Sequence, residues 1–265
     1  MIVQKDKINT PLKVFNIIVA IIMIAPLFLV VLTSFTPKEF YEIPVFEWSL
    51  RWYKTLMRST GFIRGFSLSF VLALVAGFFS LLIGFFSAFA MVRYDFKGKT
   101  LADALFMSPL TVPAVCLGIA LLQFFIKFNI FNTFFGLLMG HIVITVPYII
   151  KTAGVSLRAV SKDMELAAMN LGATWGQSFL YITMPLIRPG LISGYIFAFL
   201  ISFGEVALTL FIIGPSYQTL PVRIFNYMFD INTPVIAAIS TLLILFSIVL
   251  MVVLDKLFGL KNLLN

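Results

Sequence analysis

Long apolar runs separated by short polar segments dominate the chain. Six runs lack Lys, Arg, Asp and Glu, apart from Glu205 in the fifth. Each exceeds the roughly 20 residues with which an α-helix crosses a hydrocarbon core about 30 Å thick. Strands of a membrane barrel are about half as long and alternate apolar with polar residues, so they do not fit these runs. The pattern predicts an all-α integral membrane protein in which one domain, residues 1–265, has six transmembrane helices, near 14–36, 66–92, 104–126, 129–150, 190–213 and 232–254.

The segment between the fourth and fifth runs has a different pattern. Met164, Ala167, Ala168 and Leu171 recur at helical spacing and give a short helix one narrow apolar face. Gly172 follows at the place where a helix ends in a left-handed residue. The sequence therefore predicts a short amphipathic helix with a glycine end.

A second helix start follows this glycine. Thr174 and Gln177 have the spacing of a capping box, which predicts a second short helix. Pro185 and Pro189 are expected to break or redirect the chain before the next span, because proline removes a helix hydrogen bond.

Basic residues predict the orientation. The chain is 61% hydrophobic and 11% charged, with a formal net charge of +8. Its Lys and Arg residues flank the spans, and more of them lie on the inner side if the N-terminus is cytoplasmic. Both termini and the 161–185 segment are then cytoplasmic, with Arg93, Lys97 and Lys99 as inner anchors. The positive charge is thus explained by topology, and nucleic acid is not an expected partner.

The residues of this cytoplasmic segment resemble a known signature. Glu165-Leu166-Ala167-Ala168, then Leu171-Gly172-Ala173, then Ile182-Thr183-Met184-Pro185-Leu186 resemble the EAA signature of permease subunits of ATP-binding-cassette (ABC) importers. Leu166 and Met184 depart from the usual pattern, which has a second acidic residue and a leucine there. The resemblance implies a coupling helix that docks on the ATPase, with these site residues: Glu165, Leu166, Ala167, Ala168, Leu171, Gly172 and Pro185. The alternative is an amphipathic helix that lies on lipid headgroups.

A second resemblance narrows the family. Ser202-Phe203-Gly204-Glu205-Val206, with Gly214-Pro215-Ser216-Tyr217 and Thr219-Leu220-Pro221-Val222-Arg223-Ile224, is similar to the second permease component of spermidine/putrescine-type importers. That group includes transporters of 2-aminoethylphosphonate and opine-like amines, with ferric-ion permeases more distant. It implies import of a small cationic or amine-bearing solute. One carboxylate of the acidic pair common in that group is missing here, because Gly204 precedes Glu205.

The resemblance also implies the partners. They are two copies of an ATPase, a second permease that forms a heterodimer with this chain, and an extracytoplasmic substrate-binding protein, all at the bacterial cytoplasmic membrane. ATP and Mg²⁺ bind the ATPase, and this chain needs no cofactor. Its Gly98-Lys99-Thr100 lacks the first glycine of a phosphate-binding loop, since Arg93 stands there. No catalytic motif is present, so the chain is expected to be non-catalytic. The alternative function is a self-sufficient ion-coupled carrier, and such a carrier would have more ionisable residues within its spans.

A few residues within the spans have expected roles. Glu205 is placed inside the fifth span, about 22 Å from its start at 1.5 Å per residue. It either lines the translocation path or is buried against a partner permease. Gly190 and Gly194 predict close helix packing, and His141 predicts hydrogen bonds inside the bundle. Pro109, Pro113 and Pro147 are expected to bend their spans.

Overall fold

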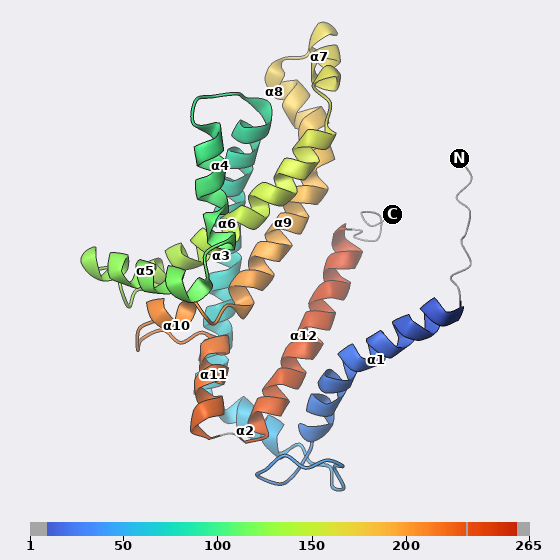
Figure 1. Ribbon diagram of the computed structural model, residues 1–265, viewed down its shortest axis with the longest axis vertical. Helices are drawn as coiled ribbons and strands as arrows, with labels where there is room; N and C mark the ends of the chain where they lie inside the picture. The colour runs from blue at the N-terminus through green and yellow to red at the C-terminus, as the bar shows by residue number, and fades with distance from the viewer. Residues whose placement is uncertain (1–9, 232, 259–265) are drawn as a thin grey trace. The chain divides into compact units, whose positions relative to one another are not determined.

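The computed structural model describes residues 10–231 and 233–258, and every regular element in this part of the chain is helical (Figure 1). The chain divides into two compact units, and each is described by itself. The first comprises Met1–Thr60 and Tyr227–Val253, and the second comprises Gly61–Asn226 and Leu254–Asn265.

The first unit contains two long apolar helices and one short amphipathic helix. The long helices are α1 (Thr10–Thr33) and α12 (Val235–Phe258), and the short one is α2 (Arg51–Arg58). No side chain in the apolar window of α1 is buried, as expected of a helix that faces lipid. Helix α2 buries Trp52 and Leu56 on one side.

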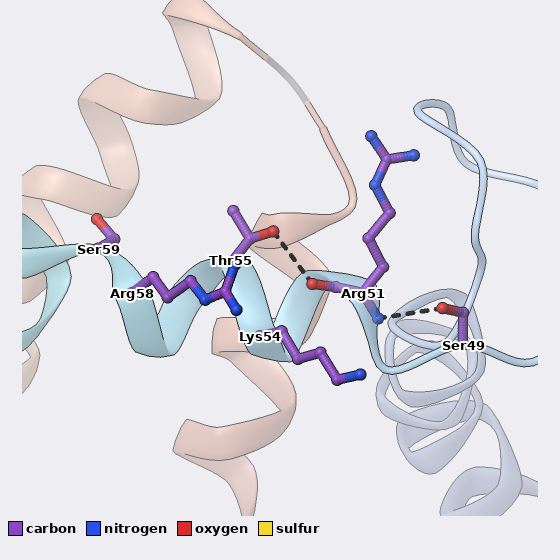
Figure 2. Close-up of a pocket in the computed structure, with 6 residues that line it drawn as sticks. All are labelled: Ser49, Arg51, Lys54, Thr55, Arg58 and Ser59. Atoms are coloured by element: carbon purple, nitrogen blue, oxygen red, sulfur yellow. Dashed lines mark hydrogen bonds between the residues drawn. The ribbon is translucent and has the colours of Figure 1, made fainter.

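The other side of α2 forms a basic groove of about 600 Å³. It is shown in Figure 2 and lined by Ser49, Arg51, Lys54, Thr55, Arg58 and Ser59. Helix α2 is thus amphipathic, with aromatic and aliphatic residues packed inside the protein and a basic face outside.

The second unit is built around α6 (Phe134–Ala159), which packs on α3 (Thr60–Arg93) and on α9 (Met184–Gly204). The buried residues of one core cluster come from α3, α6 and α9, together with Val160 after α6: Ala88, Val146, Ile150, Ala153, Leu157, Val160 and Ile187. A second cluster adds α5 (Ala114–Lys127) and the segment of α10 (Thr209–Ile212): Leu72, Ala76, Phe125, Leu137, Leu138, Ile144, Leu208 and Ile212. Helix α11 (Leu220–Asp230) follows α10.

Small residues set the spacing between α6 and α9. A Cβ at Gly190 would meet the side chain of Ser156, and one at Gly194 would meet Thr152 and Ile149. The predicted close packing at these two glycines is confirmed, because only a residue without a side chain lets the two backbones approach this closely.

The third expected span is interrupted. Helix α4 (Lys99–Met107) and the 3₁₀ turn η1 (Ser108–Leu110) are separated from α5 by a bend of 106°. Pro113 lies at the bend with extended backbone angles and caps α5. The expected bend of this span at Pro109 and Pro113 is confirmed, and the run 104–126 forms two helices, because the two prolines remove two amide donors within five residues.

The fifth expected span begins and ends earlier than predicted. Helix α8 (Trp175–Ser178), the π turn η2 (Phe179–Thr183) and α9 run on without a break as one helix, Trp175–Gly204. The expected break at Pro185 and Pro189 is wrong. In η2 the Met184 N–H bonds to the Phe179 carbonyl five residues back, so the hydrogen-bond register has already shifted when Pro185 enters near the start of α9.

Four helical stretches of the described residues are long and apolar enough to cross a membrane. They are Pro11–Thr33, Thr60–Arg93, Phe134–Ala159 and Trp175–Gly204. A fifth is added if Lys99–Leu110 and Ala114–Lys127 form one bent span. Helix α12 matches the sixth predicted span, but its apolar stretch, Val235–Leu250, is shorter, and residue 232 lies outside the described part.

Candidate coupling segment and translocation path

The 161–185 segment begins with α7 (Lys162–Asn170), at the end of the α6–α9 pair (Figure 1). Ser161 caps this helix, since its hydroxyl accepts from the Asp163 N–H at 3.1 Å. Asp163 and Glu165 lie in the first turn, where the helix dipole favours negative charge. Nine residues alone make a marginal helix in water, so the cap and the contacts described below are needed to hold it.

Helix α7 ends as the sequence predicts. The Gly172 N–H donates to the Met169 carbonyl at 3.0 Å, and the Ala173 N–H donates to the Ala168 carbonyl at 3.1 Å. These two bonds form a Schellman motif, and Gly172 has the positive φ of 95° that this motif requires. The predicted glycine end is confirmed.

The second predicted helix start is confirmed as well. The Thr174 hydroxyl accepts from the Gln177 N–H at 3.3 Å, and the Gln177 side chain accepts from the Thr174 N–H at 2.8 Å. This reciprocal pair is a complete capping box and opens α8. Both ends of the turn between α7 and α8 are thus fixed by local hydrogen bonds.

Helix α7 presents apolar side chains to its surroundings. Leu171 is 91% exposed and Leu166 is 54% exposed, while Met164 and Ala167 are also exposed and Ala168 is half-buried. A rigidly capped helix that leaves a leucine almost fully exposed is unfavourable in water. The face has the composition of a surface that another apolar surface covers.

Glu165 is held inside the chain. Its Oε1 accepts from Arg93 Nη2 at 2.7 Å and from the Thr183 hydroxyl. Its backbone carbonyl accepts from the Ser178 hydroxyl at 3.3 Å. The carboxylate therefore pairs with Arg93 of α3, inside this chain.

Arg93 was the residue that sequence reasoning missed. It was interpreted only as an inner anchor, yet its side chain is 8% exposed and points into the 161–185 segment. A charge that follows a long apolar run looks the same in the sequence whether it faces lipid headgroups or a carboxylate 72 residues away. Nothing local distinguishes the two cases.

Glu205 does not lie inside a helix. It follows the last residue of α9 with extended backbone angles (φ −72°, ψ 127°). Its Oε1 accepts from the Leu208 N–H at 2.8 Å and so caps the turn that leads into α10. The prediction of a helix through 190–213 is wrong here, because a half-buried carboxylate that caps the next turn offers the backbone an alternative to continuing α9.

His141 links the two sides of this break. The fully buried imidazole hydrogen-bonds the Ser202 hydroxyl of α9 at 2.8 Å through Nδ1 and the Thr209 hydroxyl of α10 at 3.1 Å through Nε2. The predicted hydrogen bonds of His141 inside the bundle are confirmed. They hold the residues before and after Glu205 on the same helix, α6.

The described residues contain no cluster of metal-binding side chains. Within residues 10–231 and 233–258, no three His, Cys, Asp or Glu side chains gather closely enough to hold a metal ion.

Known proteins identify this arrangement. The fold matches a bacterial alginate ABC transporter solved in complex with its alginate pentasaccharide-bound periplasmic protein (TM-score 0.68, 14% identity, 92% of this chain and 90% of that one). The fold is therefore that of an ABC importer permease. The chain belongs to the family described as binding-protein-dependent transport system inner membrane component, whose family model matches residues 80–259.

Relatives of known role agree with this family. The chain is 30% identical to the spermidine/putrescine transport system permease protein PotC of Haemophilus influenzae, over 94% of this chain and 96% of that protein. It is 29% identical to the putrescine transport system permease protein PotI of Escherichia coli, over 83% and 80%. The chain is thus a multi-pass permease of the bacterial inner membrane, homologous to polyamine permeases. It is a non-catalytic importer subunit without cofactors of its own; its partners are an ATPase, which binds ATP, and a substrate-binding protein.

Proposed function

We propose that this chain forms half of the translocation path of an ATP-driven importer and that α7 docks on the ATPase. The exposed apolar face of α7 carries the proposal, because a surface of this kind needs a cover. Leu166, Ala167 and Leu171 supply the contact, and the small Ala168 lets the backbone approach closely. Glu165, Gly172 and Pro185 act from behind this face by holding its position.

The continuous helix from Trp175 to Gly204 suits this role. A push on α7 would pass through the turn at Gly172, which is fixed by hydrogen bonds at both ends, into α8, and α8 continues into α9 without a break. Helix α9 ends at Gly204, directly before Glu205, so the same element would connect the ATPase contact with the carboxylate of the path. Alternating access would then follow from a change between two discrete packings of α9 and its neighbours.

Six spans with both termini in the cytoplasm complete the proposed topology. The bent pair α4 to α5 counts as the third span and α12 as the sixth. The amphipathic helix α2, with its basic groove, would then lie at the outer interface (Figure 2). A different permease chain would supply the other half of the path.

If α7 docks on the ATPase, a charge placed on its exposed apolar face should weaken binding of the ATPase. Leu171→Asp is expected to reduce co-purification of the ATPase at least about tenfold, because a charge enters the centre of the apolar contact. Leu171 is 91% exposed, so the substitution removes no internal packing. The measurement is the ratio of ATPase to permease after affinity purification of the whole complex.

Phe96→Asp is the matched control. Phe96 is also an exposed apolar residue and lies in the loop between α3 and α4, outside the 161–185 segment. It should leave the ratio unchanged. Equal ratios for the parent and the Leu171→Asp complex would refute docking through this face.

The substrate is proposed to be a small amine-bearing cation. The names of the relatives PotC and PotI point to polyamines, and Glu205 offers a carboxylate at the end of α9. Glu205→Gln tests its charge alone, since the glutamine amide oxygen can still accept from the Leu208 N–H. We expect uptake of radiolabelled spermidine and putrescine to fall about tenfold, the equivalent of roughly 1.4 kcal/mol.

Glu47→Gln controls for the loss of a carboxylate. Glu47 is exposed in the loop before α2 and should have no effect on uptake. If Glu205→Gln transports both amines at the parental rate, the carboxylate only caps its turn.

A further inference from the structure

Arg93 is a buried cation at the end of a long apolar helix. It is the last residue of α3, and its guanidinium is directed at two neighbouring elements. Nη1 donates to the Val160 carbonyl at 3.2 Å, at the end of α6, and Nη2 donates to Glu165 of α7 at 2.7 Å. The fork of the guanidinium thus joins α3 to both sides of the α6–α7 junction.

The contact is reciprocal. Lys162, the first residue of α7, donates from Nζ to the backbone carbonyl of Arg93 at 3.4 Å. Phe89 of α3 packs edge-on against Phe179 of η2, with ring centroids 5.6 Å apart. Ring contacts from α3 thus reach α8 and η2, whereas the ion pair reaches α7 itself through charge-assisted hydrogen bonds, which require a defined geometry.

Stability alone does not explain this ion pair. Taking two charges out of water costs about as much as their attraction returns, so a buried pair is weak evidence for stability. Arg93 Nε is also buried without a hydrogen-bond partner, which adds a cost. What the pair supplies is a fixed orientation of α7 relative to α3.

We propose that Arg93 is a positioning residue that joins α3 to the coupling helix α7 through Glu165. Movement of α7 reaches α9 through the hydrogen-bonded turn and the continuous helix that begins with α8, and it reaches α3 through this ion pair. The two helices that pack on α6 therefore respond together. This inference rests on the proposed function, because it requires that the ATPase moves α7.

Two cysteine reporters separate these routes. In a background with Cys116→Ser, Ser87→Cys places a thiol on α3 and Ser193→Cys places one on α9, and both changes are nearly isosteric. The rate of modification by N-ethylmaleimide is measured in the complete transporter, with and without ATP and vanadate. In the parent we expect nucleotide to change the rate at least about threefold at both positions. With Arg93→Gln, the change at position 87 is lost while the change at position 193 remains.

Three further variants test whether Arg93 positions α7 or only stabilises the fold. Arg93→Lys should restore part of the response at position 87, because the cation is kept but the fork that also reaches the Val160 carbonyl is lost. Glu165→Gln should repeat the Arg93→Gln result, and the double variant should be no worse than either single one, since all three lack the same link. Lys97→Gln, which removes an exposed cation four residues away, should have no effect.

Several results would overturn the inference. One is a response at position 87 that persists in Arg93→Gln or is absent in the parent. Another is an equal loss at both positions, which would make the pair a general clamp of the fold. Failure of the proposed function gives a different result. In that case the ATPase would co-purify normally with the Leu171→Asp permease, and this result does not depend on the Arg93 variants.

Discussion

Gly172→Asp is expected to abolish substrate uptake and the stimulation of ATP hydrolysis while the protein still inserts into the membrane. Gly172 closes α7 with a φ of 95°, which costs a residue with a Cβ roughly 1–2 kcal/mol. The aspartate also places a negative charge at the C-terminal end of a helix, where the dipole opposes it. A Cβ at Gly172 would have no atom within 4 Å, so nothing in the bundle is displaced. The damage is confined to the end of α7 and to the surface proposed to meet the ATPase.

Gly98→Asp is the control for backbone strain in this experiment. Gly98 has a φ of 87°, a Cβ there also meets nothing within 4 Å, and the residue lies in the loop before α4. The two substitutions therefore carry similar strain at positions of different proposed function. Uptake in proteoliposomes and ATP hydrolysis should fall at least about tenfold for Gly172→Asp only. Normal uptake by Gly172→Asp would remove the coupling role of this turn.

The parts of the site that the sequence predicted depend on short-range interactions. Each of three features involves residues within a few positions of one another: the apolar face of α7, the glycine end at Gly172 and the capping box at Thr174. Their hydrogen bonds are local, so the pattern of residue types is enough to predict them. The same holds for the long helices, whose apolar length alone fits a bilayer.

The parts that the sequence did not predict depend on distant partners or on competing local choices. The Arg93–Glu165 pair joins residues that are 72 positions apart, and no local pattern signals it. At Glu205 an apolar run predicted a continuing helix, but the carboxylate bonds to the Leu208 amide and a new turn begins. At Pro185 the expected break is absent, because the π turn before it had already changed the hydrogen-bond register. At both ends of α9 the outcome depends on the acceptor to which each backbone amide donates.

The contact between α6 and α9 predicts the largest effect on stability. Gly194 is buried, and a Cβ there would meet the Thr152 hydroxyl and lie 3.2 Å from Ile149 Cδ1 and 3.4 Å from Ile149 Cα. Because Ile149 Cα is backbone, it cannot rotate away, and Gly194→Leu must push α9 off α6. Overpacking of this kind costs about 1–3 kcal/mol, which for a chain of this size lowers the melting temperature by about 5–10 °C at its upper end.

Gly204→Leu provides the comparison for this helix. Gly204 is the last residue of α9, is exposed, and has no atom within 4 Å of a Cβ position. The melting temperature of the detergent-purified protein should be close to the parental value for Gly204→Leu and clearly lower for Gly194→Leu. Gly194→Leu should also lower uptake, because less of the protein remains folded and because α9 would carry the proposed motion away from α7. An unchanged melting temperature for Gly194→Leu would mean that α6 and α9 are not packed at this distance in the membrane.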